Sequence, residues 1–215
     1  MTPSRNLRRL ERSTTYRLHK LRTLIEDSAG RVPYAELKTI VSAVTIDSLN
    51  TWANFCRAYY LSCCLGTRLR HNSYVTANIP FVDINTSIGN VVHLFRPWVT
   101  PTPSGTWHRR DEPTWHDASI LLKSCQHIGA SNIAQIAAAL SIGTRVFLDL
   151  PVCRNYCAHK NRRTEEAVQN IAPLSGISAL LRPMNVLLSV PLNAYDPLII
   201  VWLNDIETVV SLLCE

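Results

Sequence analysis

A long stretch without helix-breaking residues dominates this sequence. From Tyr34 to Leu65 there is neither proline nor glycine, and Gly66 closes the stretch. Pro33 stands just before it, and proline suits the first turn of a helix because its fixed φ is already helical. Apolar side chains recur through the stretch at helical spacing, namely Val41, Val44, Leu49, Trp52, Phe55, Tyr59 and Leu65. The sequence therefore predicts one long helix that forms the central strut of the fold.

Helical periodicity also appears on both sides of this strut. Residues 4–28 place leucine and isoleucine at helical spacing beneath a basic outer face, and Gly30 follows as a terminator. Further helices are predicted over 117–128, 132–140 after a Ser131 cap, 144–150, 152–161 started by Pro151, Thr164 to about Ile171, and 198–213 after Asp196 and Pro197. We therefore expect an all-α bundle that forms a single domain over residues 1–215.

Residues 70–113 have a different character. They contain five prolines, several asparagines and threonines, and short β-branched runs such as Val91-Val92. This composition predicts an irregular insertion between the long helix and the later helices, with a short hairpin in it. Such an insertion serves either as a substrate lid or as a surface loop. The sequences Trp107–Arg110 and Trp115-His116 mix aromatic and cationic groups, which suits base stacking but favours packing of the insertion onto the body.

The charge of the chain favours polyanionic partners. Lys and Arg outnumber Asp and Glu by 22 to 16, a net charge of +6. The first 22 residues hold one acid, Glu11, and seven cations, which are Arg5, Arg8, Arg9, Arg12, Arg17, Lys20 and Arg22. This block either contacts nucleic acid or keeps one helix face solvated.

The cysteines and the apolar segments indicate a cytoplasmic protein. The seven cysteines are odd in number, lack paired metal-binding spacings and mostly lie in apolar helical stretches, where a thiol packs as a small hydrophobe. A reducing compartment is therefore expected. The charged N-terminal residues form no secretory signal, and Asn204, Asp205 and Glu207 interrupt the apolar stretch 198–213. We expect no membrane span.

The chemically richest segment runs from Cys153 to Arg162. On a helix, with about 100° between successive residues, two groups of side chains separate. One face is polar and cationic and holds Arg154, Asn155, Ala158, His159 and Arg162, whereas the other holds Cys153, Tyr156, Cys157 and Lys160. Asn155 and His159 are four residues apart and therefore adjacent, and Arg154 flanks them.

Those three groups suit cleavage of RNA without a metal. The imidazole of His159 titrates near neutral pH, so it can take the proton of a ribose 2′-hydroxyl or protonate the leaving oxygen. The guanidinium of Arg154 can hold phosphate oxygens and stabilise the charge that develops on them. Asn155 can orient His159 or hold a phosphate oxygen. The plainer interpretation is that Arg154 pairs with a carboxylate and His159 makes a core contact.

The segment also resembles the signature of the HEPN ribonucleases. Their motif is an Arg, four to six residues and a His, usually with a polar residue after the Arg, and Arg154 to His159 matches it with Asn155 in the polar position. The run Ala158–Asn161 is similar to the Ala-His-Arg-Asn run of several branches. The sequence Trp52-Ala53-Asn54-Phe55 resembles a Trp-x-x-aromatic element of the family, although Ala53 stands where a Glu commonly follows the Trp. The resemblance covers roughly residues 35–65 and 115–170.

The resemblance implies an all-α HEPN-like helical bundle and a metal-independent endoribonuclease. It implies catalytic roles for Arg154, Asn155 and His159, with Lys160, Arg162 and Arg163 contacting RNA, and neither a metal nor another cofactor. It further implies a homodimer in which two motif helices face each other, and RNA products with 2′,3′-cyclic phosphate ends. Toxin–antitoxin and antiphage defence modules contain such enzymes, so an antitoxin or regulatory protein is an expected partner.

Three other interpretations stay open from the sequence. A HEPN-like fold also serves as a non-catalytic nucleotide-binding, RNA-binding or dimerisation module. Residues 131–142 resemble the start of a helix-turn-helix, but the following helix offers only Arg145 to read bases, so an ordinary core helix is favoured. Zinc binding by Cys153, Cys157 and His159 is disfavoured, because the thiols and the imidazole point to different helix faces.

Overall fold

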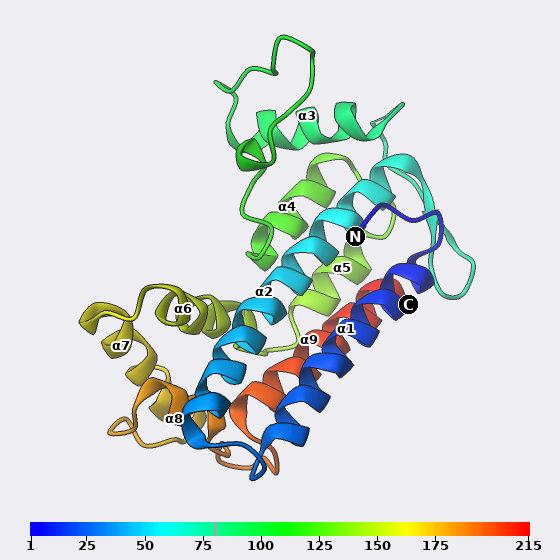
Figure 1. The fold of residues 1–215 in the computed structure, drawn as a ribbon. Helices are drawn as coiled ribbons and strands as arrows, with labels where there is room; N and C mark the ends of the chain where they lie inside the picture. The colour runs from blue at the N-terminus through cyan, green and yellow to red at the C-terminus, as the bar shows by residue number, and fades with distance from the viewer. Residues whose placement is uncertain (80) are drawn as a thin grey trace. The chain divides into compact units, whose positions relative to one another are not determined.

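The computed structural model describes residues 1–79 and 81–215, and helices dominate it (Figure 1). In chain order the helices are α1 (Leu7–Ser28), α2 (Tyr34–Leu65), α3 (Ile84–Phe95), α4 (Ala118–His127), α5 (Ile133–Leu140), α6 (Val146–His159), α7 (Arg162–Gln169), α8 (Pro183–Leu188) and α9 (Leu198–Cys214). Two antiparallel strands, β1 (Thr67–Arg68) and β2 (Tyr74–Val75), and two short 3-10 turns, Arg109–Asp111 and Ala172–Ser175, complete the set. The predicted all-α class is confirmed.

The chain divides into two compact units. Unit 1 comprises Met1–Thr14, Trp52–Gly143 and Val209–Glu215, and unit 2 comprises Thr15–Thr51 and Thr144–Thr208. Helices α1, α2 and α9 contribute residues to both units. The single domain expected from the sequence stays a prediction. No helix in the described ranges has both the length and the apolar character needed to cross a membrane.

Helix α2 has the bounds that the sequence predicts, and the part of it that belongs to unit 1 carries buried aromatic residues. The side chains of Trp52, Phe55 and Tyr59 are fully buried, and each ring centroid lies 5.7 Å from the next along the helix. Burial of such side chains contributes about 1.5–3 kcal/mol each. Gly66 ends the helix with φ of +80°, a conformation that glycine adopts without steric cost.

The insertion is more regular than its composition predicts. Residues 84–95 form α3, which Asp83 caps by accepting a hydrogen bond from the Thr86 backbone N–H at 2.7 Å. Val91 and Val92 lie in this helix with no exposed surface, so the irregular structure predicted for these residues is wrong. They share one helical face with Ser87 and Ile88, a spacing that the two adjacent valines obscure. The hairpin expected within residues 70–113 is found only in part, because β2 lies in the insertion whereas its partner β1 (Thr67–Arg68) precedes it. Pro80 lies outside the described residues.

A buried carboxylate holds the end of the insertion to α2. Glu112 is 7% exposed and accepts hydrogen bonds from Arg57 Nε at 2.6 Å, Arg57 Nη2 at 2.9 Å, Arg109 Nη1 at 2.8 Å and Trp115 Nε1 at 2.8 Å. The Trp115 ring also packs against Tyr60, with centroids 5.4 Å apart. Packing, rather than base stacking, is therefore the structural role of Arg109 and Trp115.

Candidate functional site in α6

One continuous helix carries the candidate residues, whereas the sequence predicts a fresh helix from Pro151. Helix α6 runs from Val146 to His159 with Pro151 inside it. An interior proline removes one backbone hydrogen bond and strains the preceding turn. The buried residues of α6 fall in one stripe that continues past Pro151, namely Val146, Asp149, Leu150, Cys153 and Cys157. Pro151 lies on the opposite side of the helix from this stripe, and burial of the stripe offsets the lost bond.

The helix ends sooner than the motif analysis assumes. Lys160, with φ of 12° and ψ of 63°, leaves the helical conformation, and His159 is the last residue of α6. Asn161 then begins α7 with a reciprocal cap, in which the Thr164 backbone N–H donates to Asn161 Oδ1 and the Asn161 N–H donates to Thr164 Oγ1. The placement of Arg162 on the face of Arg154 and His159 is therefore wrong. Asparagine competes for the backbone here and favours a cap over a continued helix.

The three proposed catalytic side chains lie on the accessible side of α6. Arg154 is half-buried, and Asn155 and His159 are exposed. Within residues 1–79 and 81–215, the structure shows no side-chain hydrogen bond or ion pair for any of the three. Asn155 and His159 are one turn apart, and Arg154 flanks them at the edge of the buried stripe. The plainer interpretation has Arg154 paired with a carboxylate and His159 in contact with the core. Neither side chain has such a partner in the residues that the structure describes.

The opposite face of α6 anchors the helix within unit 2. Burial raises the pKa of the Cys157 thiol, and the hydroxyls of Ser42 and Thr45 on α2 partly counter this rise. Burial likewise raises the pKa of Cys153 and of Tyr156, with the Glu165 carboxylate adding to the rise at Tyr156. Thiols with raised pKa values are poor nucleophiles and poor metal ligands. No group of three or more His, Cys, Asp or Glu side chains able to hold a metal occurs among the described residues.

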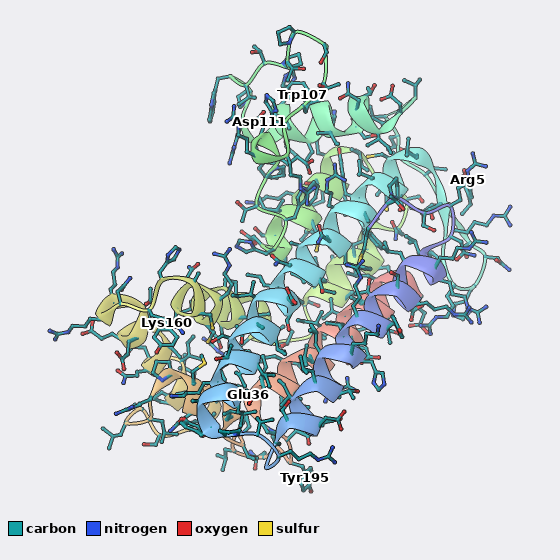
Figure 2. All side chains as sticks on the ribbon, viewed as in Figure 1. Arg5, Glu36, Trp107, Asp111, Lys160 and Tyr195 are labelled. Carbon is teal, nitrogen blue, oxygen red and sulfur yellow. The ribbon has the colours of Figure 1, made fainter. Side chains whose placement is uncertain are left out.

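The three cations expected to contact RNA gather where α6 gives way to α7. Lys160, Arg162 and Arg163 are all exposed, and Figure 2 shows Lys160 at this corner. Arg162 Nε lies 2.8 Å from Glu166 Oε1, but its side chain is 94% exposed, so the pair is weak. The side chains of Lys160 and Arg163 have no ion pair in the ranges that the structure covers. Lys160 and Arg163 are therefore available to an anionic ligand near the C-terminal end of α6.

Two features of α6 lie outside the motif that the sequence singles out. Leu148 is 68% exposed and lies on the same helical face as Asn155 and His159, which are seven and eleven residues further on. A helical projection of the whole of α6, rather than of the motif alone, would have found it. Asp149 is buried and accepts two hydrogen bonds from Arg145, each 3.0 Å long. This pairing occupies Arg145, the one side chain that a helix-turn-helix in this segment would use to read bases.

No family model, curated protein or solved structure matches this chain. A functional assignment therefore depends on the residues of α6 and on the resemblance of their spacing to the HEPN motif.

Proposed function

We propose that the protein is a metal-independent endoribonuclease of the HEPN type, with Arg154, Asn155 and His159 as its catalytic residues. The observation that carries this proposal is the free face of α6. Asn155 and His159 lie on that face and Arg154 flanks it; all three suit phosphodiester chemistry, and none has a partner in the described chain. Polar groups kept unpaired on a helix whose other face is buried are available to a ligand.

Each of the three groups has a defined task in the proposed reaction. The imidazole of one His159 takes the proton from a ribose 2′-hydroxyl, which then attacks the adjacent phosphorus. The bond between phosphorus and the 5′-oxygen breaks, and the imidazolium of His159 gives its proton to that oxygen, so the products end in a 2′,3′-cyclic phosphate and a 5′-hydroxyl. Arg154 stabilises the negative charge on the phosphate oxygens, and Asn155 orients His159 or binds the phosphate. Lys160, Arg162 and Arg163 hold the flanking phosphates.

A second copy of the chain completes the site in this proposal. Within one chain Arg154 flanks the face of Asn155 and His159, so the guanidinium and the imidazole do not converge on one point. Two α6 helices that face each other across a two-fold axis bring the Arg154 of one chain toward the His159 of the other. Leu148, exposed on the same face, supplies apolar surface that such a contact would bury.

The cellular role follows from the family resemblance. A ribonuclease of this kind harms its own cell, so we propose a toxin or antiphage effector that an antitoxin or regulatory protein restrains. Overproduction of the chain alone is expected to stop growth, and His159→Ala is expected to relieve this effect. Equal growth arrest by both proteins would contradict the proposed role.

The activity assay uses matched histidine variants. Total RNA is incubated in EDTA with the wild type, with His159→Ala and with His127→Ala, whose exposed histidine lies at the end of α4. We expect cleavage by the wild type and by His127→Ala, and a loss of at least about 10²-fold for His159→Ala. Cleavage by all three proteins would refute the role of His159. Binding of RNA without cleavage by any of them would favour the non-catalytic module instead.

A further inference from the structure

Unit 1 carries most of the positive charge of the protein. It holds eleven Lys and Arg against six Asp and Glu, a net charge of +5, whereas unit 2 holds eleven against ten. The candidate residues of α6 belong to unit 2. The charge excess therefore needs an explanation other than the α6 site.

Five of these eleven cations lie at or just before the start of α1 and on β1. Arg5, Arg8, Arg9, Arg12 and Arg68 are exposed, and none has an ion pair in the described parts of the chain. The nearest acid in sequence, Glu11, is already paired, because Arg70 donates a hydrogen bond to each of its carboxylate oxygens. We call these five residues the arginine surface. Three other arginines of the same unit, Arg57, Arg70 and Arg109, are each in an ion pair.

The fold brings the five side chains into one neighbourhood. Arg8, Arg9 and Arg12 lie on adjacent positions of the first turns of α1, and Arg5 precedes them by one turn. The Arg68 backbone N–H donates to the Arg5 carbonyl oxygen at 3.1 Å, so β1 joins the start of α1. In Figure 2 Arg5 lies beside the N-terminal end of α1. The surface thus combines a helix and a strand that are more than fifty residues apart in sequence.

An exposed aromatic ring adjoins the arginines. Tyr74 is 60% exposed and is the cross-strand partner of Arg68. Such partners lie about 4.5–5.5 Å apart at Cβ and share one face of the hairpin. A side chain at Gly66 would collide with the Tyr74 hydroxyl, so the glycine leaves the space that this ring occupies. An unpaired guanidinium beside an exposed ring is the combination that holds a phosphate while the ring stacks on a base.

A cavity of about 610 Å³ opens beside the same residues. Its lining includes Arg5, Gly66, Leu65 and Phe81, together with the polar side chains of Ser62 and Asn85. The wall mixes apolar side chains with polar ones, among them the Asp83 carboxylate. Apolar surface beside hydrogen-bonding groups suits the insertion of a flat heterocycle, such as a base turned out of a single strand. A base-paired duplex does not offer such a base.

We propose that the arginine surface binds the backbone of single-stranded RNA, with Tyr74 stacking on one base. This inference deepens the proposed function, because it takes the polymer to be the RNA that α6 would cut. The five arginines neutralise successive phosphates, so affinity falls steeply as salt rises. Unit 1 then supplies substrate affinity, and unit 2 supplies the reacting groups.

The test measures binding separately from cleavage. A fluorescein-labelled single-stranded RNA of about 16 nucleotides is titrated in EDTA with the full chain carrying His159→Ala, and anisotropy gives Kd at several salt concentrations. The test variant adds Arg8→Gln, Arg9→Gln and Arg12→Gln. The control adds Arg110→Gln, Lys123→Gln and Arg182→Gln, three exposed cations that are not part of the arginine surface and have no ion pair in the described residues, with the same change in net charge. Far-UV circular dichroism confirms that both remain helical, as glutamine is a good helix former.

The expected effect follows from counterion release. Each phosphate contact contributes about 0.7 to the slope of log K against log salt for a single strand, so loss of three contacts lowers the slope by about 2 and weakens binding about 100-fold at 0.1 M salt. The control is expected to weaken RNA binding by less than about 10-fold, one tenth of that factor. Equal losses for both triple variants would overturn the proposal, as would tight binding of anionic phosphatidylserine vesicles by a protein that does not bind RNA. Specific loss in the test variant would support it even if the wild type cuts no RNA.

Discussion

Replacing Glu112 by glutamine tests whether the buried carboxylate holds unit 1 together. The substitution keeps the shape of the side chain but leaves the charge of Arg57 without its counterion, and Arg57 is only 19% exposed. Breaking a buried ion pair by removal of one partner costs about 3–5 kcal/mol. Since Arg57 keeps some contact with water, and Arg109 is half exposed, we expect a value near the lower end, about 3 kcal/mol.

The assay is equilibrium unfolding in urea, followed by circular dichroism. Glu166→Gln is the matched control, because its pair with Arg162 has a similar N–O distance, 2.8 Å, but side chains that are 94% and 55% exposed. Exposed pairs of this kind contribute about 0.3–0.5 kcal/mol. Adding Arg57→Met to Glu112→Gln is expected to restore part of the loss, because no buried charge is then left unpaired. A cost for Glu112→Gln no larger than that for Glu166→Gln would refute this reasoning.

Three further predictions concern α3, the thiols and the face of α6. Hydrogen bonds from Thr86 lower the pKa of Asp83 below its ordinary value of 3.8. Protection of the α3 amides from hydrogen exchange should therefore stay constant as pH falls to about 4 and decline only below pH 4. Asp83→Asn should remove that decline. All seven cysteines are buried, and burial raises the pKa of Cys64 to about 12, so a thiol reagent at pH 8 should modify the chain only as fast as it unfolds; rapid labelling of the native protein would show that the thiols are accessible. Leu148→Glu should convert the proposed dimer to a monomer in sedimentation at micromolar concentration. Leu180→Glu, at a leucine that is 93% exposed, should leave that dimer intact. An unchanged dimer in the Leu148 variant would place the interface elsewhere.

The long helices were predictable because their signals are redundant. Helix α2 combines an absence of breakers, a terminal glycine and a periodic apolar stripe, and its observed bounds agree with those signals. Helix α4 begins where Asp117 caps it, as a local hydrogen bond from Ser119 N–H requires. Each of these signals lies within a few residues of the structure that it determines.

The errors arose where tertiary contacts outweigh a local preference. Pro151 favours a helix start, but the buried stripe on either side of it keeps α6 continuous. The prolines around α3 suggest irregular structure, while Asp83 and four buried side chains at helical spacing decide for a helix. In α6 the spacing of Arg154, Asn155 and His159 could be proposed from sequence, and a projection of the whole helix would have added Leu148. The loss of Arg162 to α7 follows from the local cap at Asn161, which competes with continuation of α6. Which polar side chains of α6 stay without a partner could not be predicted, because this depends on which face of the helix the rest of unit 2 covers.

The most direct test of the central claim is the chemistry of a single cleaved phosphodiester. Once a cleaved site has been mapped, a synthetic RNA with deoxyribose at the residue 5′ to that site is compared with the all-ribose strand, in EDTA, with mass spectrometry of both product ends. We predict a 2′,3′-cyclic phosphate and a 5′-hydroxyl from the all-ribose strand, and no cleavage of the deoxy-substituted site, because the 2′-hydroxyl is the nucleophile. Cleavage of the substituted site, or a 5′-phosphate product, would contradict the proposed role of α6.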